Sequence, residues 1–382
     1  MKTRSPVRSP SDSESPSSRE LRSRAESLAR RLKEEPGRMD LAMNLAEILE
    51  NLGDWRDALR VVERMAKKGA ATPELVRLRA ECLRRVGRAD EAVQVLEEAS
   101  DLITGNLAAM ITRGRCLAAA GQTDAAVQML RETIRIDSKS AEAQYALGTA
   151  LARAGKAAEA ERSFKQAISL APDMSKAYVN LGILFDAMGR KKEGIEALRQ
   201  AVVCNPDSAV AHANLGAFYG EQGRGEEARA ELERALEIDA NSAETHFNLA
   251  ILYLDEGRLE DAAEAISTAR RLAPEDTRIL YYSGVLMLRQ GRYRDAVKSF
   301  KEYTRIVPNE SRGPYHLGVA LLRLGQLDDA VLSLQQAVKF DSAHPRAHYY
   351  LGVALDRKGL KHEARIAYRA ADRLDRGGSV TR

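Results

Sequence analysis

The sequence predicts an all-α protein built as an α-solenoid, a row of ten tandem helical hairpins of 34 residues each. The first observation behind this prediction is a glycine that returns ten times at a spacing of 34 residues, from Gly53 to Gly359, without an insertion. The second is a Gly or Ala seven residues before each of these glycines. The third is an Ala five residues after each of them, except that Gly194 takes this place once. Self-similarity at a fixed period is the signature of a repeat architecture.

Composition supports helices and excludes other classes. Apolar residues make up 44% of the 382 residues and charged residues 30%, but aromatic residues only 5%, which argues against a β-rich fold. No apolar run approaches the roughly 18 residues that cross a bilayer, and the first residues lack the apolar segment of a secretory signal. We therefore expect a cytoplasmic protein without a membrane span. Cys82, Cys116 and Cys204 are widely separated and predict small buried side chains, not a disulfide framework or a zinc site.

The chain begins with a segment of different character. Residues 1–18 contain seven Ser and three Pro and cannot form a core, so we expect them to be disordered. The pairs that start at Ser5, Ser9 and Ser15 are Ser-Pro sequences that a proline-directed kinase could modify, although such pairs are common in short Ser/Pro tails. Residues 19–38 should form a capping helix with a polar outer face, because three leucines recur there at near-helical spacing.

The ten repeats run from residues 39–72 to residues 345–378, and the positions within each repeat are numbered 1 to 34. The pattern in each repeat predicts two helices that pack closely together. Small residues fall at positions 8 and 20, and larger apolar residues at positions 7, 11 and 24, as in Leu181, Gly182 and Phe185 of the fifth repeat. This is helical spacing, and two helices approach closely only where side chains are small. Glycine at position 15 should end the first helix in the left-handed conformation, and proline at position 32 of four repeats should end the second. Residues 379–382 follow as a short tail.

This 34-residue pattern resembles the tetratricopeptide repeat. The shared features are a small residue at position 8, glycine at 15, alanine at 20, a bulky residue at 24 and proline at 32. The resemblance covers 39–378 and implies a right-handed superhelix whose first helices line a concave groove that binds extended peptides. The first three repeats depart most, with Arg79 and Arg113 at position 7 and no proline at position 32. His212 and His246 occupy position 4, where the family often has an aromatic residue, and we expect them to be partly buried, not metal ligands.

The face of the first helix that should line the groove holds positions 2, 6, 9 and 13, which lie at helical offsets. Position 6 is asparagine in three successive repeats, Asn180, Asn214 and Asn248. An asparagine side chain both donates and accepts hydrogen bonds, as the main chain of an extended peptide requires. The run is similar to the asparagine ladder in the superhelix of O-linked N-acetylglucosamine transferases, which implies a role in holding peptide backbone. A merely solvated polar face is the alternative.

The last three repeats carry a regular set of cationic and aromatic candidates for a peptide-binding site. These are Arg278, Arg312 and Arg346 at position 2, Tyr281, Tyr315 and Tyr349 at position 5, Tyr282, His316 and Tyr350 at position 6, and Arg289, Arg323 and Arg357 at position 13. Residues 277–382 have 19 Lys and Arg against 10 Asp and Glu, a net charge of +9, whereas 39–276 have 30 against 39, a net charge of −9. Arginine forks pair with carboxylates or phosphates, so the set predicts an acidic or phosphorylated partner segment. Pairing of these arginines with Asp or Glu of neighbouring second helices is the alternative.

The sequence therefore predicts a non-enzymatic scaffold that binds proteins or peptides, without cofactor or metal. The six histidines form no His-Glu-x-x-His, and only four residues follow the last repeat, so we expect no catalytic domain and at most the recruiting arm of a separate enzyme. The family's carboxylate clamp for C-terminal tails requires asparagine at position 9, which no repeat has. RNA binding through the basic, Tyr-bearing last repeats is the other alternative, and the acidic middle of the chain argues against it. Self-association stays open.

Overall fold

The computed structural model describes residues 16–35, 37–67, 69 and 72–378. Every regular element in that part of the chain is α-helix, as the sequence predicts. The expected disordered segment lies outside the described residues up to position 15, as do the first two Ser-Pro pairs and the tail 379–382. Helix α1 (Pro16–Glu34) begins three residues before Arg19, where the capping helix was expected to start. Proline suits the first turn of a helix because the N–H that it lacks would have no intrahelical partner there.

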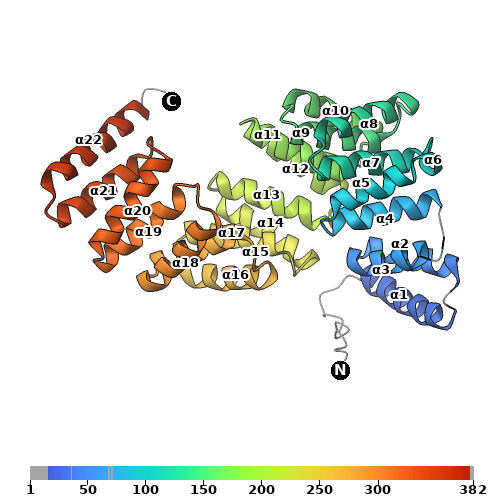
Figure 1. Cartoon of the computed structure of the whole chain (residues 1–382), viewed down its shortest axis with the longest axis horizontal. Helices are drawn as coiled ribbons and strands as arrows, with labels where there is room; N and C mark the ends of the chain where they lie inside the picture. The colour runs from blue at the N-terminus through green and yellow to red at the C-terminus, as the bar shows by residue number, and fades with distance from the viewer. Residues whose placement is uncertain (1–15, 36, 68, 70–71, 379–382) are drawn as a thin grey trace. The chain divides into compact units, whose positions relative to one another are not determined.

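Each 34-residue repeat contributes a first helix, here called helix A, and a second, called helix B (Figure 1). The A helices are α2 (Met39–Asn51), α4 (Pro73–Arg85), α7 (Leu107–Ala119), α9 (Ala141–Arg153), α11 (Ser175–Ala187), α13 (Ala209–Glu221), α15 (Ala243–Asp255), α17 (Thr277–Arg289), α19 (Arg312–Leu324) and α21 (Pro345–Arg357). The B helices are α3 (Trp55–Ala66), α5 (Ala89–Glu98), α8 (Thr123–Ile136), α10 (Ala157–Leu170), α12 (Lys191–Cys204), α14 (Gly225–Ile238), α16 (Leu259–Leu272), α18 (Tyr293–Ile306), α20 (Leu327–Phe340) and α22 (Lys361–Gly378). The short α6 (Ser100–Ile103) follows α5 in the second repeat.

The chain divides into two compact parts. Of the described residues, those within 16–218 and 237–240 make up the N-terminal part, and 219–236 and 241–378 make up the C-terminal part. Within each part, helix A packs on helix B of its own repeat, and helix B packs on helix A of the next, for example α9 on α10 and α10 on α11. Successive A helices such as α7 and α9 also touch. This is the stacking that an α-solenoid requires.

The glycine at position 15 ends helix A as predicted. All ten of these glycines have positive φ angles, between 70° and 86°. At Gly325, with φ at 77°, the backbone N–H closes the end of α19 by donating to Leu322 O at 3.2 Å. Glycine adopts this left-handed conformation without the steric cost that a Cβ brings. The recurrence in the sequence is therefore a recurrence of helix ends.

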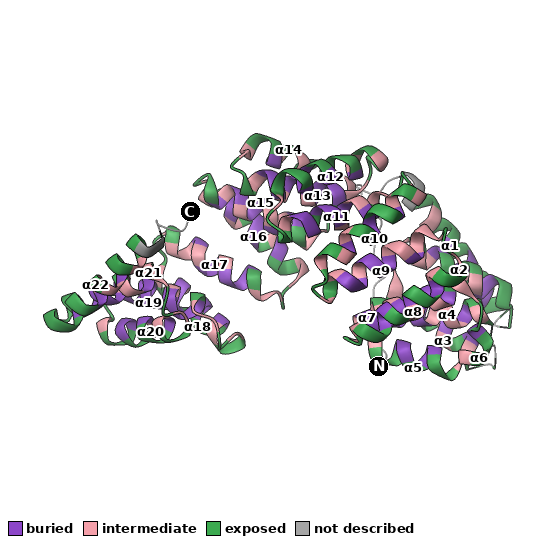
Figure 2. Ribbon diagram, turned by 90° about the horizontal axis from the view of Figure 1, so that it is seen from above, coloured by how far each residue is buried: buried purple, intermediate pink, exposed green. Residues whose placement is uncertain are grey.

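The small residue at position 8 allows the large residue at position 24 to pack directly against helix A. A Cβ added at Gly148 would lie 2.7 Å from ring carbons of Phe164, and one added at Gly318 would lie 2.5 Å from Leu334 Cγ. Buried residues lie where neighbouring helices face one another, and exposed residues cover the outer sides (Figure 2). The predicted hairpin packing is confirmed, and it extends to the second and third repeats despite Arg79 and Arg113.

No helix in the described ranges combines the length and apolar character needed to cross a membrane. His212 is 7% exposed and its Nε2 lies 3.0 Å from Pro206 O, which confirms its expected burial. Cys82 and Cys116 are buried, whereas Cys204 is half-buried, and the three are free thiols. Among the residues with described positions, no group of three or more His, Cys, Asp or Glu side chains is arranged to hold a metal ion.

Candidate functional site

The A helices of the N-terminal part form a surface, here called the A-helix surface, that holds a cavity of about 260 Å³. Its walls come from α4, α7, α9 and α11, and five of its described lining residues are cationic, whereas none is a carboxylate. These five are Arg84, Arg85, Arg115, Arg153 and Lys176. Tyr145, Thr149 and three alanines also line the cavity. We call it the cationic pocket.

The pocket forms because positions on one face of helix A converge from successive repeats. Arg115 and Thr149 occupy position 9 of the third and fourth repeats, Arg153 occupies position 13, and Lys176 and Asn180 occupy positions 2 and 6 of the fifth. These are the four positions that helical geometry places on one face. Because α7, α9 and α11 stack at the repeat period, residues far apart in the sequence meet here.

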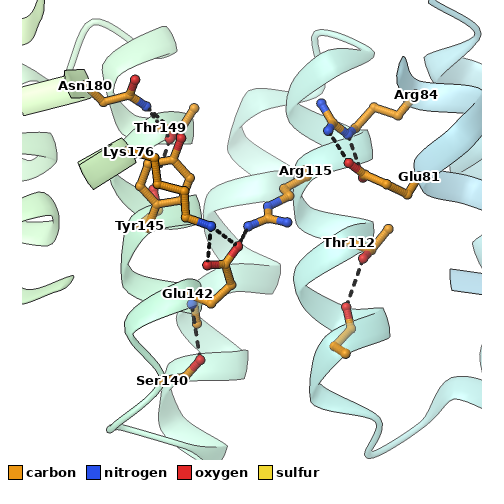
Figure 3. A network of polar contacts seen from close by, with 12 residues as sticks. Glu81, Arg84, Thr112, Arg115, Ser140, Glu142, Tyr145, Thr149, Lys176 and Asn180 are labelled. Atoms are coloured by element: carbon orange, nitrogen blue, oxygen red, sulfur yellow. Dashed lines mark hydrogen bonds and ion pairs between the residues drawn. The ribbon is translucent and has the colours of Figure 1, made fainter. Parts of the chain in front are cut away.

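A carboxylate at the rim links two of the cations (Figure 3). Glu142 of α9 forms an ion pair with Arg115 and contacts Lys176 Nζ at 2.6 Å. The Lys176 ammonium also lies 4.9 Å from the centroid of the Tyr145 ring, an arrangement that favours a cation. Lys176 is thus positioned by an ion pair on one side and an aromatic ring on the other.

Asn180 belongs to this site. Its Nδ2 donates to Tyr145 Oη at 3.1 Å and to Thr149 Oγ1 at 3.3 Å. These bonds hold both hydroxyl groups at the pocket while leaving the Asn180 side-chain oxygen as an acceptor. Asn214 is placed differently, since its Nδ2 donates to Val210 O of its own helix at 2.7 Å. Asn248 is half-buried on α15. The three asparagines therefore share a helix position without sharing a set of contacts.

A buried carboxylate anchors the α4 side of the pocket. Glu81 is buried and accepts hydrogen bonds from Arg84 Nε at 2.9 Å and Arg85 Nε at 3.0 Å. Burial alone would raise the pKa of Glu81, but the hydrogen bonds and charge of Arg84, and then those of Arg85, lower it to about 2. Glu81 is therefore ionised at neutral pH and fixes the two guanidinium groups.

The pocket keeps an excess of positive charge after these pairs are formed. Five cations face two nearby carboxylates, Glu81 and Glu142. Burial, opposed by Glu81 and reinforced by the positive charge of Arg84, lowers the pKa of Arg115. Burial first, and then the charges of Arg115 and Arg85, lower the pKa of Lys176 to about 8, against the charge of Glu81. Both shifts express the cost of holding like charges together away from water.

Some of the arginines predicted as peptide ligands in the C-terminal part form ion pairs with carboxylates of the protein itself. Arg278 pairs with Glu244 at 2.6 Å and Asp276 at 2.7 Å, and Arg312 contacts Glu310 Oε2 at 2.5 Å and Tyr303 Oη at 2.7 Å. These carboxylates lie on the preceding helix A or in the connecting loops, not on helix B as the alternative had it. Arg323 and Arg346 are exposed.

In three of the five repeats that have arginine at position 13, this arginine closes the end of the preceding helix A. Arg357 Nη1 donates to Leu322 O at 3.0 Å, Arg153 Nη1 donates to Ala118 O at 3.1 Å, and Arg289 donates to Leu254 O. Each acceptor lies in the last turn of a helix, where a positive charge is favourable. For Arg289 and Arg357, predicted as peptide ligands, this contact is a structural role that sequence reasoning missed.

We expect Arg357→Met to lower the free energy of unfolding of the C-terminal part by about 1 kcal/mol, the net value of one such hydrogen bond. The methionine retains most of the aliphatic stem, so packing is conserved. Urea denaturation followed by circular dichroism measures the change, and Arg346→Met, an exposed arginine of the same helix, is the control. Equal stability of Arg357→Met and wild type would remove the capping role.

The predicted aromatic residues divide into core and surface. Tyr281 and Tyr315 are each 9% exposed, and burial first, followed by neighbouring tyrosine hydroxyls, raises the pKa of each to about 12. Tyr281 Oη lies 3.2 Å from His316 Nδ1 in a hydrogen bond. Burial lowers the pKa of His316 to about 4, so its ring is neutral at pH 7. These three residues belong to the packing between repeats and do not offer the free groove-facing surface that was expected of them.

The other aromatic candidates are more accessible. Tyr349 is 51% exposed, and Tyr282 and Tyr350 are half-buried. Tyr349 and Tyr350 of α21 lie edge to face with centroids 5.5 Å apart, and Tyr282 packs in the same way on Phe247 at 5.3 Å. Together with Arg323 and Arg346, Tyr349 is the part of the predicted C-terminal set that stays available to a partner.

Sequence comparison places the repeats in a known group. Residues 19–281 match the family model of the C-terminal domain of cilia and flagella-associated protein 70, and residues 278–310 and 315–379 match two tetratricopeptide-repeat models. None of the curated proteins matches the chain.

Solved structures share the fold at low sequence identity. A tetratricopeptide repeat protein from Parabacteroides merdae is 17% identical, covers 64% of this chain and 97% of its own, and has a TM-score of 0.51. The structure described as the APC/C hetero-tetramer Cut9-Hcn1 is 14% identical, covers 93% of this chain and 90% of its own, and has a TM-score of 0.52. At these identities the similarity concerns the architecture alone.

Proposed function

The chain belongs to the tetratricopeptide-repeat family, and from this premise we propose that it is an interaction scaffold whose A-helix surface holds an acidic or phosphorylated segment of a partner protein. The coarser part of this statement, a scaffold for protein–protein interaction, is the general role of the family's repeats. The repeat family and its helical solenoid are in general not catalytic. The acidic or phosphorylated character of the segment is our proposal.

The observation that carries the proposal is the cationic pocket. Four helices deliver five cationic side chains to one cavity of the A-helix surface, and two nearby carboxylates compensate them only in part. Arg84 and Arg115 are half-buried, and the exposed Arg85, Arg153 and Lys176 extend the positive charge to the open side of the cavity, so the site attracts an anion. A carboxylate or phosphoryl group of a partner supplies that anion through charge-assisted hydrogen bonds.

The C-terminal part supports the same chemistry. Residues 277–382 carry a net charge of +9, and Arg323, Arg346 and Tyr349 are exposed there. Of the three asparagines predicted to bind peptide backbone, we retain Asn180 for this site, because it contacts the pocket residues Tyr145 and Thr149. We therefore propose two binding regions for acidic segments, with the cationic pocket as the principal one.

A protein partner is favoured over RNA by two observations. The −9 net charge of residues 39–276 opposes a long polyanion. Tyr281 and Tyr315, which could have stacked on bases, are buried.

The test is the affinity of the full chain for a fluorescein-labelled decapeptide rich in glutamate, measured by anisotropy. We expect Arg115→Glu combined with Lys176→Glu to weaken binding about tenfold to hundredfold, since each charge-assisted bond contributes roughly 1.5 kcal/mol or more. Arg323→Glu with Arg346→Glu should cause a smaller loss. The control is Arg64→Glu with Lys67→Glu, exposed residues at helix B with the same change in charge.

Unchanged affinity in both double variants would contradict the proposal, provided that their circular dichroism spectra match that of wild type. Binding of a single-stranded RNA of similar length that is tighter than binding of the peptide, with a steep loss as salt rises, would replace it with the nucleic-acid alternative.

A further inference from the structure

The cationic pocket has the size and donor set of a site for one compact oxyanion. Its volume of about 260 Å³ accommodates a tetrahedral group of five heavy atoms with its attached side-chain carbon. The pocket is therefore large enough for the end of a single modified side chain.

The charge of the pocket distinguishes between a carboxylate and a phosphoryl group. Five cations against Glu81 and Glu142 leave a formal excess of three positive charges. One carboxylate neutralises one of them. A phosphorylated serine or threonine carries about −1.5 to −2 charges at pH 7 and three strong acceptor oxygens, which matches the excess more closely.

The donors are placed to reach several oxygens of one anion. Glu142 already shows how an oxyanion sits there, because its carboxylate bridges the guanidinium of Arg115 and the ammonium of Lys176 (Figure 3). A guanidinium has five N–H donors in a planar fork, and Arg115 turns its Nη2 toward Glu142 in that ion pair. Tyr145 adds a hydroxyl group that Asn180 holds at the same wall, whereas the Thr149 hydroxyl donates to the Tyr145 backbone O at 3.0 Å and is not a donor for the anion.

We propose that the cationic pocket binds the phosphoryl group of a phosphorylated serine or threonine in the partner segment, with Arg115 and Lys176 as its direct ligands. This inference rests on the proposed function and names the chemical class of the group that the pocket accepts. Arg85 and Arg153 supply the surrounding positive charge, and the incoming group takes over the bridging position of Glu142.

Binding at the pocket can be followed by tryptophan fluorescence. The guanidinium carbon of Arg85, which lines the pocket, lies 4.9 Å from the centroid of the ring of Trp55, the single tryptophan of the chain. An anion that attracts Arg85 changes the surroundings of this indole. Occupation of the pocket is therefore expected to change the tryptophan emission.

The experiment compares three decapeptides of one sequence that carry serine, glutamate or phosphoserine at the central position. The full chain is titrated with each by calorimetry, and Trp55 emission is recorded in parallel. We expect the phosphoserine peptide to bind at least about tenfold more tightly than the glutamate peptide, as one additional charge-assisted bond would give. Lys176→Met and Arg115→Lys should abolish this preference, whereas Arg64→Met, an exposed arginine of α3, should preserve it.

The outcomes separate this inference from the proposed function. Equal affinity for the phosphoserine and glutamate peptides overturns the phosphoryl assignment but leaves the acidic-segment scaffold standing. A phosphoserine preference that survives in both folded pocket variants places the site elsewhere and overturns the assignment. Inorganic phosphate that changes Trp55 emission and binds as tightly as the phosphopeptide shows a site for the free ion, which overturns the phosphorylated side chain as its occupant. Binding of none of the three peptides would overturn the proposed function itself.

Discussion

Replacing Phe300 with alanine is expected to lower the free energy of unfolding of the C-terminal part by about 3 to 5 kcal/mol. Phe300 is fully buried on α18, and its ring fills the space that the missing side chain of Gly284 leaves on α17. A Cβ at Gly284 would lie 2.8 Å from this ring. The ring also stacks on His316, with centroids 5.4 Å apart. Alanine would leave a cavity in a contact that neighbouring residues cannot close.

The effect should be local, because each repeat in a solenoid contacts only its neighbours. Hydrogen exchange of α17, α18 and α19 in the full chain measures it, since exchange reports the stability of separate segments. Phe340→Ala is the matched control, as Phe340 is 39% exposed at the end of α20 and should lose much less. Equal protection losses in the two variants would contradict the packing of position 24 against position 8.

Replacing Glu81 with glutamine is expected to lower the free energy of unfolding of the N-terminal part by about 3 to 5 kcal/mol at pH 7. Glu81 is 5% exposed and accepts hydrogen bonds from Arg84 and Arg85. Glutamine has nearly the same shape but no charge, so two guanidinium groups would lose their counterion. Removing one partner of a buried ion pair costs more than the pair itself contributes.

The same substitution should change the response to acid. The pKa of Glu81 is lowered to about 2 in the folded protein, against about 4.3 for an unperturbed glutamate. The stabilisation from Glu81 is therefore complete above pH 4.3 and is lost as the pH falls toward 2. Urea denaturation at pH 7, 4 and 2.5 should show a difference between wild type and Glu81→Gln that shrinks with decreasing pH. The control is Glu74→Gln at the exposed start of α4, where we expect less than about 1 kcal/mol. A difference that stays constant with pH would exclude the ion-pair explanation.

Most of the fold follows from the sequence because its determinants are local and repeat. Gly325 ends a helix through its own backbone conformation, and Gly148 faces Phe164 within one hairpin. Such contacts depend on the spacing of residues within one 34-residue repeat, and the same residue pattern recurs in all ten repeats. The division of helix B in the second repeat into α5 and α6 has no such signal.

The candidate site was only partly predictable. Helical offsets identify the face of helix A that holds Lys176 and Asn180. The recurrence of arginine and tyrosine, however, favoured the last three repeats, where Arg278 pairs with Glu244 and Arg357 donates to Leu322 O. The cationic pocket has no recurrence, because Arg115 and Lys176 occupy different positions of different repeats. Reading the groove-facing positions across repeats three to five would have found both residues. The buried partner Glu81 would not have been found in this way, because an ion pair in the interior depends on packing between helices.

The most direct test of the account is the amine reactivity of two lysines in the full chain, followed by mass spectrometry after brief acetylation with and without the phosphoserine decapeptide. Lys176 on helix A is 49% exposed, and Lys165 on helix B is 57% exposed. The account predicts that the peptide protects Lys176 and leaves Lys165 as reactive as before. Protection of Lys165 in place of Lys176, or no protection of Lys176 at a saturating concentration of peptide, would contradict binding at the A-helix surface.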